Sequence, residues 1–379
     1  MKAVTLHQTQ GEWKPGPKCY HPVQLMPVAD KDQVLVKVLA SAFNHRDLFQ
    51  RQSLYPGTVF TTDDSPAVMG ADAVGICLTP NHPLHNKHVL VAPAVNWLTS
   101  PFGPDQGPTK PFGILGAVKQ TQGRGTFAEY VVVGKDDIIE CPRHFVDGGK
   151  QGMAQAAALP LGGLTAYRQV HFGLIRGLSW QTGAVFTKAR VEKGQHVLVT
   201  GIGGGVAITA LQLAVAAGAK VWVSSSSEEK IAKAKELGAQ GGVNYKESDW
   251  PKKLATMLPK DRPYLDAVID SGGGDIANQV MRVLKDGGIV SCYGQTTGQA
   301  VPISMGFVLK NQEFKGSTMG SRQEFFDSVK FVEQHKIEPV VSDVLSSLDE
   351  FEKGFEILKK NSQFGKIVIH VEREGKRKL

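Results

Sequence analysis

The stretch Val197-Leu-Val-Thr-Gly-Ile-Gly-Gly-Gly-Val-Ala207 predicts how the middle of this chain folds. A short apolar run gives way to glycines, and apolar residues then return at helical spacing, which is typical of a strand, a tight turn and the start of a helix. Gly201 allows the sharp turn, Gly204 lets a diphosphate approach the backbone, and Ala207 lets the helix pack closely on the sheet. The stretch therefore predicts a dinucleotide-binding turn.

Backbone amides at the start of this helix, those of Gly205 and Val206, are expected to face the phosphates, because a helix N-terminus favours negative charge. Gly201, Gly203 and Val206 form an alternative triplet, but it places a branched side chain where packing is closest. A flexible glycine loop is the other alternative, and the flanking strand and helix argue against it.

The rest of the chain divides into two textures. From about residue 191 strands alternate with helices, which predicts a parallel sheet covered by helices on both faces. The strands are expected at 197–200, 220–224, 265–270 and 288–294, and the helices at 205–217, 227–237 (with Gly238 as its C-cap) and 275–284. Residues 1–160 are β-rich, with strands expected at 33–40, 87–93 and 127–133 and a long loop at 96–125. Near the end, helices are expected at 322–334 and 348–360, and a strand at 366–371.

Composition indicates an ordinary globular protein of about two domains. The 379 residues carry a net charge of +7 and are 41% apolar, with no apolar run near the roughly 18 residues of a membrane span. No signal or transit peptide is recognisable at the N-terminus, so a cytoplasmic location is expected. Arg377-Lys378-Leu379 matches the peroxisomal Ser-Lys-Leu signal at only two positions, so peroxisomal import is not expected.

The charge of the chain and its side-chain chemistry limit the kinds of cofactor, macromolecule and metal that it is expected to bind. A mild positive charge suits phosphate-bearing cofactors, and without an aromatic-and-basic RNA motif nucleic acid is not an expected partner. The four cysteines, Cys19, Cys77, Cys141 and Cys292, lie far apart and predict reduced, mostly buried thiols. His82, His85 and His88 have ligand-like spacing, but Pro83 prevents a regular helical face, so surface-turn histidines are expected.

Several motifs, in order along the chain, resemble the medium-chain dehydrogenase/reductase superfamily. They are Asn44-His-Arg-Asp-Leu-Phe, Gly70-Ala-Asp-Ala-Val-Gly, Gly125-Thr-Phe-Ala-Glu-Tyr, Leu159-Pro-Leu-Gly-Gly-Leu-Thr-Ala-Tyr, the glycine turn and Gly316-Ser-Thr-Met-Gly. The resemblance implies a GroES-like β-rich catalytic domain from residues 1–160 and 318–379, and a doubly wound Rossmann domain at 161–317. It further implies a cleft between the two domains for nicotinamide and substrate, and assembly as a homodimer or homotetramer.

Zinc-dependent members of this superfamily hold a catalytic ion with Cys, His and Cys. The matching positions here are Asn44, Ala71 and Leu161, and neither Ala nor Leu has a donor atom in its side chain. The loop at 96–125 also lacks the four cysteines of the structural zinc lobe in those relatives. We therefore expect no metal site in this chain.

The second strand of the dinucleotide domain suggests which nicotinamide cofactor binds. NAD-preferring domains carry an acidic residue about 20 positions after the glycine turn, whereas Ser224 and Ser225 stand there in this chain. Lys230 can add positive charge, and Tyr245 resembles a residue beside the adenosine phosphate in zinc-less relatives. These residues favour NADPH. As an alternative, the serines only cap the next helix and its first-turn glutamates disfavour a phosphate, which leaves NADH possible.

Without a metal, the candidate catalytic residues are Tyr55 as proton or hydrogen-bond donor and Asn44 as an orienting amide. The resemblance places Thr165 beside the nicotinamide. Arg46 and Asp47 are expected to form an ion pair that anchors their loop. Tyr55 can equally be only a wall of the pocket.

We therefore expect an NADPH-dependent, zinc-independent oxidoreductase that transfers hydride to a quinone or an α,β-unsaturated carbonyl compound. One alternative is an alcohol or aldehyde dehydrogenase of the same fold. Another is a protein that binds the cofactor but is catalytically silent, with a structural or RNA-binding role. An insert at about 169–183 departs from the superfamily pattern, and both a real loop and a translated intron remain open.

Overall fold

The computed structural model describes residues 1–8, 30–170 and 188–371. It divides the chain into two compact units, the first made of Met1–Leu161 with Ser321–Leu379 and the second of Gly162–Gly320. Most of the insert expected at 169–183 lies outside the described residues, as do Cys19 and the C-terminal tripeptide at 377–379.

The second unit is built on a six-stranded sheet in which every neighbouring pair is parallel. Its strands are β8 (His196–Val199), β9 (Lys220–Ser225), β10 (Gly241–Asn244), β11 (Leu265–Asp270), β12 (Leu284–Cys292) and β13 (Glu313–Gly316). They lie in the order β10-β9-β8-β11-β12-β13, which is the doubly wound order of dinucleotide-binding domains. The predicted parallel sheet is confirmed.

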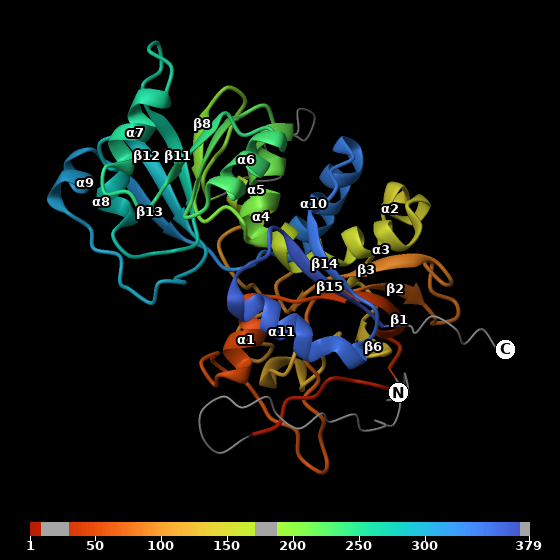
Figure 1. Ribbon diagram of the computed structural model, residues 1–379. Helices are drawn as coiled ribbons and strands as arrows, with labels where there is room; N and C mark the ends of the chain where they lie inside the picture. Colours follow the sequence, from red (N-terminus) through yellow and green to blue (C-terminus); the bar gives the residue numbers. More distant parts are fainter. Residues whose placement is uncertain (9–29, 171–187, 372–379) are drawn as a thin grey trace. The chain divides into compact units, whose positions relative to one another are not determined.

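Helices cover both faces of this sheet (Figure 1). They are α4 (Pro160–Val170), α5 (Gly205–Ala216), α6 (Glu228–Glu236), α7 (Trp250–Met257), α8 (Ile276–Val280) and α9 (Met305–Leu309). A Cβ added at Gly241 would lie 3.7 Å from the sulfur of Met257 in α7, whereas one at Gly242 would lie 2.6 Å from Ile231 in α6. Since successive strand residues point to opposite faces, α6 and α7 lie on opposite sides.

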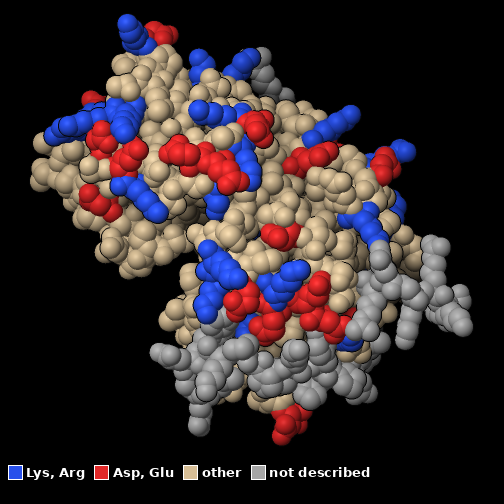
Figure 2. All heavy atoms as spheres, in the orientation of Figure 1, with Lys and Arg blue, Asp and Glu red and all other residues tan. Residues whose placement is uncertain are grey.

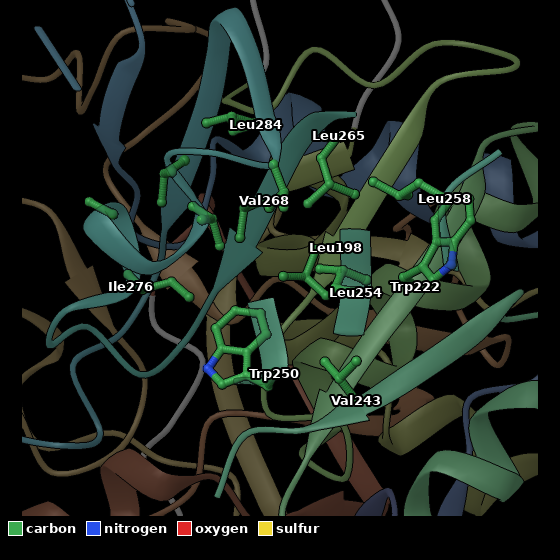
Figure 3. Packing of buried hydrophobic residues seen from close by; sticks show 14 of the residues in the cluster. Leu198, Trp222, Val243, Trp250, Leu254, Leu258, Leu265, Val268, Ile276 and Leu284 are labelled. Carbon is green, nitrogen blue, oxygen red and sulfur yellow. The ribbon is translucent and has the colours of Figure 1, made fainter. Parts of the chain in front are cut away.

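The core on the α7 side joins α7 and α8 to the sheet. Leu198 and Val268 of the central strands pack with Trp250 and Leu254 of α7 and with Ile276 of α8 (Figure 3). All five are buried, so this face of the sheet is fixed by apolar packing. The carboxyl edge of the sheet, where each strand leads into the turn that follows it, is available for polar residues.

Two element ends differ from the sequence-based expectation. The helix expected at 275–284 ends at Val280, because Leu284 is buried in β12 and pairs with Leu265. Packing in the sheet therefore overrides the helical pattern there. Leu237, not Gly238, is the C-cap of α6, and Gly238 follows it with a φ of +102°.

The first unit contains a seven-stranded sheet of order β14-β15-β1-β2-β3-β7, in which β6 also pairs with β1. These strands are β1 (Gln33–Ala42), β2 (Val74–Cys77), β3 (His88–Val91), β6 (Tyr130–Gly134), β7 (Ile138–Glu140), β14 (Val341–Leu345) and β15 (Lys366–His370). The pairing of β15 with β1 brings distant parts of the chain together, with Ala40 opposite His370.

Short elements surround this sheet. The helices are α1 (His45–Arg51), α2 (Arg143–Asp147), α3 (Gly149–Ala157), α10 (Arg322–His335) and α11 (Phe351–Lys360), and the 3₁₀ turns are η1 (Lys119–Thr121) and η2 (Leu348–Glu350). β4 (Ala94–Val95) pairs with β5 (Gly113–Ile114) in the loop region. The single helix expected at 348–360 is thus η2 followed by α11. No helix in the described ranges is long and apolar enough to cross a membrane.

Candidate functional site

The glycine turn joins β8 to α5 at the carboxyl edge of the parallel sheet. Gly201 has a φ of +63° and Gly203 a φ of +138°, backbone conformations that favour glycine. Gly204 is the N-cap of α5, and a Cβ added to it would meet no atom within 4 Å. Ala207 is buried. This turn can therefore receive a diphosphate against the first amides of α5, at Gly205 and Val206.

Lys230 lies over this turn. Its Nζ is 3.2 Å from the position that a Cβ on Gly203 would occupy. Burial lowers the pKa of the Lys230 ammonium below its usual value. The Lys230 amide donates to Ser227 Oγ at 3.3 Å, so Ser227 caps α6. The cap thus places a lysine charge beside the glycine turn.

Ser224 and Ser225, the last two residues of β9, are both buried. Ser225 Oγ donates to the Ile202 carbonyl at 3.4 Å and accepts from the Ser227 amide at 3.2 Å. The Ser225 hydroxyl is therefore engaged within the turn. The Tyr245 amide donates to the Ser225 carbonyl at 3.1 Å, and its side chain is 49% exposed.

The acidic residues at the start of α6 have other partners. Asn244 Nδ2 donates to Glu228 Oε1 at 3.2 Å, and Lys233 Nζ donates to Glu229 Oε1 at 2.6 Å. Both carboxylates are thus partly neutralised or hydrogen-bonded away from the turn. A phosphate placed at Lys230 would therefore meet weaker repulsion from these two carboxylates.

A second glycine-rich turn, Ser271-Gly-Gly-Gly274, follows β11 at the same edge, and it was not singled out from the sequence. Asp270, buried at the end of β11, accepts from Thr200 Oγ1 at 2.6 Å and from the Gly273 amide at 2.7 Å. The turn is thus tied to the end of β8. A glycine run directly after the apolar strand at 265–270 is the sequence signal that could have identified it.

Thr165 lies on α4 in the same unit. It is 6% exposed, and its Oγ1 is 3.6 Å from the sulfur of Met319. Gly162, one turn earlier, approaches α5 closely enough that an added Cβ would be 4.0 Å from the Val206 amide nitrogen. The structure therefore brings α4 to the first turn of α5.

The two candidate catalytic residues belong to the first unit and flank α1. The Asp47 carboxylate accepts a hydrogen bond from the backbone amide of Asn44 at 2.8 Å, and it lies 3.5 Å from Arg46 Nη1. Arg46 also donates to the carbonyls of Leu115 and Gly116, so the predicted ion pair that anchors this loop is confirmed.

Arg46 also connects this helix to Tyr55. The guanidinium carbon lies 4.7 Å from the centre of the Tyr55 ring, within the range of a cation–π contact. Tyr55 is partly exposed. Tyr55 is therefore linked to Asn44 through Arg46 and Asp47.

Asn44 belongs to a buried polar network that the sequence analysis missed. Lys366 Nζ donates to Asn44 Oδ1 at 2.6 Å and to Asp72 Oδ2 at 2.8 Å. Asn44 Nδ2 donates to Asp72 Oδ2 at 2.9 Å, and the Leu161 amide donates to Asp72 Oδ1 at 2.5 Å. No local pattern indicated this set, because Lys366 and Asp72 are 294 positions apart.

Burial shifts the pKa values of two ionisable groups next to this network. Burial raises the pKa of Asp47 to about 6, with Arg46 acting in the opposite direction. Burial, together with the charge of Lys366, lowers the pKa of His45. Both groups lie at the start of α1, so the electrostatics of this helix depend on desolvation.

The positions that hold zinc in related enzymes are apolar here except for Asn44. Ala71 and Leu161 are buried and offer no side-chain donor. Within the described ranges no group of three or more His, Cys, Asp or Glu residues is arranged to hold a metal. The three histidines at 82, 85 and 88 lie in or just after the turn that precedes β3.

Comparisons with known proteins identify the family to which this architecture is similar. A family model described as alcohol dehydrogenase GroES-like domain matches residues 30–143, and one described as zinc-binding dehydrogenase matches 205–334. A zinc-type alcohol dehydrogenase-like protein of Leptosphaeria maculans is 40% identical, covering 94% of this chain and 96% of that protein.

Two further similarities are more distant. An acryloyl-coenzyme A reductase of Sulfurisphaera tokodaii is 26% identical, covering 94% of this chain and 98% of that protein. The crystal structure of an NAD-dependent alcohol dehydrogenase superposes with a TM-score of 0.76 at 28% identity, covering 98% of this chain and 100% of the other.

The fold and these similarities together define an oxidoreductase with a dinucleotide-binding unit and a GroES-like unit. The chain belongs to the medium-chain dehydrogenase/reductase superfamily.

Proposed function

We propose that this chain is an NADPH-dependent, zinc-independent reductase of α,β-unsaturated carbonyl compounds or quinones. The observation that carries the cofactor choice is the position of Lys230 over the glycine turn. A 2′-phosphate placed near this ammonium gains a charge-assisted contact. The partnered state of Glu228 and Glu229 removes part of the opposing charge.

The chain's own residues divide the work between the two units. When bound, the reduced nicotinamide supplies the hydride. Gly205 and Val206 bind the diphosphate through their amides, and Thr165, on α4, positions the nicotinamide side. Ser224, Ser225 and Tyr245 line the adenosine end. Tyr55 donates a proton or a hydrogen bond to the substrate, while Arg46 fixes its ring.

The substrate class is supported by one relative and by the apolar side chain at position 161. The Sulfurisphaera tokodaii relative is named for reduction of an acryloyl thioester, which is an α,β-unsaturated carbonyl compound. Leu161 in place of a polar ligand favours a flat, conjugated substrate over a small alcohol. The similarity to an NAD-dependent alcohol dehydrogenase favours the second candidate, an alcohol or aldehyde dehydrogenase.

Three further proposals accompany this function. The first unit acts as the catalytic domain and the second as the cofactor domain, close to the division at 1–160 with 318–379 and 161–317. The protein acts in the cytoplasm. It assembles as a homodimer or homotetramer through the open edge of β13, which pairs only with β12 among the described strands.

A catalytically silent RNA-binding protein is a less favoured alternative. On the face drawn in Figure 2, lysines and arginines lie interspersed with aspartates and glutamates. Proteins that track a nucleic-acid backbone present a continuous basic surface. Salt-sensitive RNA binding without any NADPH turnover would favour this alternative over the reductase.

The deciding experiment follows NADPH oxidation by purified protein with a panel of enones, enoyl thioesters and quinones. NADH and a set of alcohols with NAD or NADP serve as the comparison. Turnover of an enone or quinone that prefers NADPH supports the proposal. Turnover confined to alcohols identifies a dehydrogenase, and loss of turnover after chelation contradicts zinc independence.

A further inference from the structure

The name of the matching family model suggests a zinc enzyme, and the residues at the equivalent site do not fit zinc. Zinc in proteins is held by Cys, His, Asp or Glu side chains. Two of the three expected positions, Ala71 and Leu161, have none of these, and the third, Asn44, presents an amide. The donor set, not the content of the site, excludes a zinc centre there.

A resident cation already lies at this place. Lys366 is 6% exposed, and its Nζ contacts both Asn44 Oδ1 and Asp72 Oδ2 at 2.6 and 2.8 Å. Asp72 is completely buried, so its charge needs a close partner. An ammonium at this distance supplies that charge and repels a second cation.

The same contacts fix the orientation of the Asn44 amide. Its oxygen accepts from Lys366, and its nitrogen donates to Asp72 Oδ2 at 2.9 Å. Asp72 also accepts from the Leu161 amide. Lys366 and Asp72 thereby connect two of the three positions that carry metal ligands in zinc-dependent relatives.

We propose that in this chain the Lys366 ammonium takes the electrostatic place that the metal ion has in zinc-dependent relatives. Lys366 is a positioning residue: it neutralises Asp72, holds Asn44 in one orientation and keeps the start of α1 in place. The effect on turnover rests on the proposed reductase function, whereas the effects on metal affinity and on folding stability do not.

The test compares Lys366→Met with Lys366→Arg and with Lys360→Met, an exposed lysine in the last turn of α11. Lys366→Met is expected to lower kcat at least about tenfold, with an NADPH Kd within about twofold of wild type. Lys366→Arg retains the charge and is expected to recover most of kcat. Lys360→Met is expected to behave as wild type. A wild-type kcat and KM in Lys366→Met overturns the proposal.

A second measurement is independent of turnover. Leaving Asp72 buried without its partner is expected to lower the melting temperature of Lys366→Met by about 5–10 °C. The double variant Lys366→Met/Asp72→Asn is expected to regain part of this loss, because no buried charge remains. Folding of the double variant where Lys366→Met alone does not fold supports the same coupling. Additive losses contradict it.

Metal content completes the test. Wild-type protein dialysed against a chelator and then exposed to Zn²⁺ is expected to bind no zinc at stoichiometric level, measured by elemental analysis and calorimetry. One tightly held zinc per chain overturns the proposal, whatever the substrate. If wild type oxidises NADPH with no substrate in the panel, the reductase function fails, while stability and metal binding still decide the role of Lys366.

Discussion

Lys230 is the residue on which the choice between the two reduced nucleotides depends. We predict that Lys230→Ala weakens NADPH binding about tenfold and leaves NADH binding nearly unchanged, because a single charge-assisted contact is worth about 1.4 kcal/mol. Fluorescence titration of both nucleotides measures this. Lys235→Ala, an exposed lysine on the same helix, is the matched control. Equal weakening of both nucleotides would remove Lys230 from the discrimination.

The Tyr55 hydroxyl is the proposed proton donor. We predict that Tyr55→Phe lowers kcat about 100-fold, the scale of a lost general acid, without changing NADPH affinity. Phenylalanine keeps a ring beneath the Arg46 guanidinium, so the loop retains its position. Steady-state kinetics with an enone checks the prediction, and a wild-type kcat would leave Tyr55 as part of the pocket wall.

The raised pKa of Asp47 predicts that the folding stability of the chain depends on pH. Its pKa of about 6 lies above the usual carboxyl value of 3.8, so the folded chain holds a proton that the unfolded chain has released between about pH 4 and pH 6. The free energy of unfolding contributed by this group therefore falls as the pH rises through that window.

Asp47→Asn removes this titration. From about pH 4 to pH 6.5, we expect wild type to lose up to about 3 kcal/mol of stability relative to Asp47→Asn. Urea unfolding of both proteins at each pH measures the difference. Two parallel stability curves would show that Asp47 titrates normally.

At the scale of elements, substitutions in the turn from β8 to α5 are expected to affect either folding stability or nucleotide binding, depending on which glycine is changed. Gly204 has a φ of −77° and open space at its Cβ position. We predict that Gly204→Ala keeps the melting temperature but weakens nucleotide binding at least about tenfold, since the new methyl group meets the diphosphate.

Gly201→Ala is the contrasting variant. At a φ of +63°, and with Ser271 Oγ 2.9 Å from the added Cβ, it is expected to cost at least about 1 kcal/mol of stability. Thermal unfolding separates the two variants. A Gly204→Ala protein that binds NADPH normally would show that the diphosphate does not approach this glycine.

The same element shows what sequence can predict. The β8–α5 turn was predictable because its glycines, strand and helix are adjacent in the chain. The end of α8 was not, because Leu284 joins the sheet through its pairing with Leu265. The Asn44–Asp72–Lys366 network was equally hidden, since a buried ion pair across 294 positions has no local pattern.

At the scale of the whole molecule, we propose that copies of the chain associate through the edge of β13, which pairs only with β12 among the described strands. Met305 and Leu309 of α9, the helix that precedes β13 in the chain, are 68% and 75% exposed, and Phe314 of β13 is 36% exposed. Antiparallel pairing of two β13 strands, with Phe314 on the two-fold axis, places Glu313 opposite Lys315 of the second copy. An exposed edge with this self-complementary charge favours a dimer.

We predict that light scattering finds a dimer or a tetramer, and that Leu309→Lys raises the dissociation constant of the β13 contact at least about 100-fold. Phe102→Lys, which changes an 83% exposed ring in the first unit, is the matched control. A monomeric wild type, or a Leu309→Lys protein that associates like wild type, would exclude this edge as the contact.

The pairing of β15 with β1 has a consequence for biosynthesis. The strand that brings Lys366 follows the whole second unit in chain order. During translation, the earlier part of the first unit therefore has an unfilled position in its sheet, and the Asp72 carboxylate lacks its Lys366 counter-ion. The sheet position and the ion pair are completed only after this strand has left the exit tunnel.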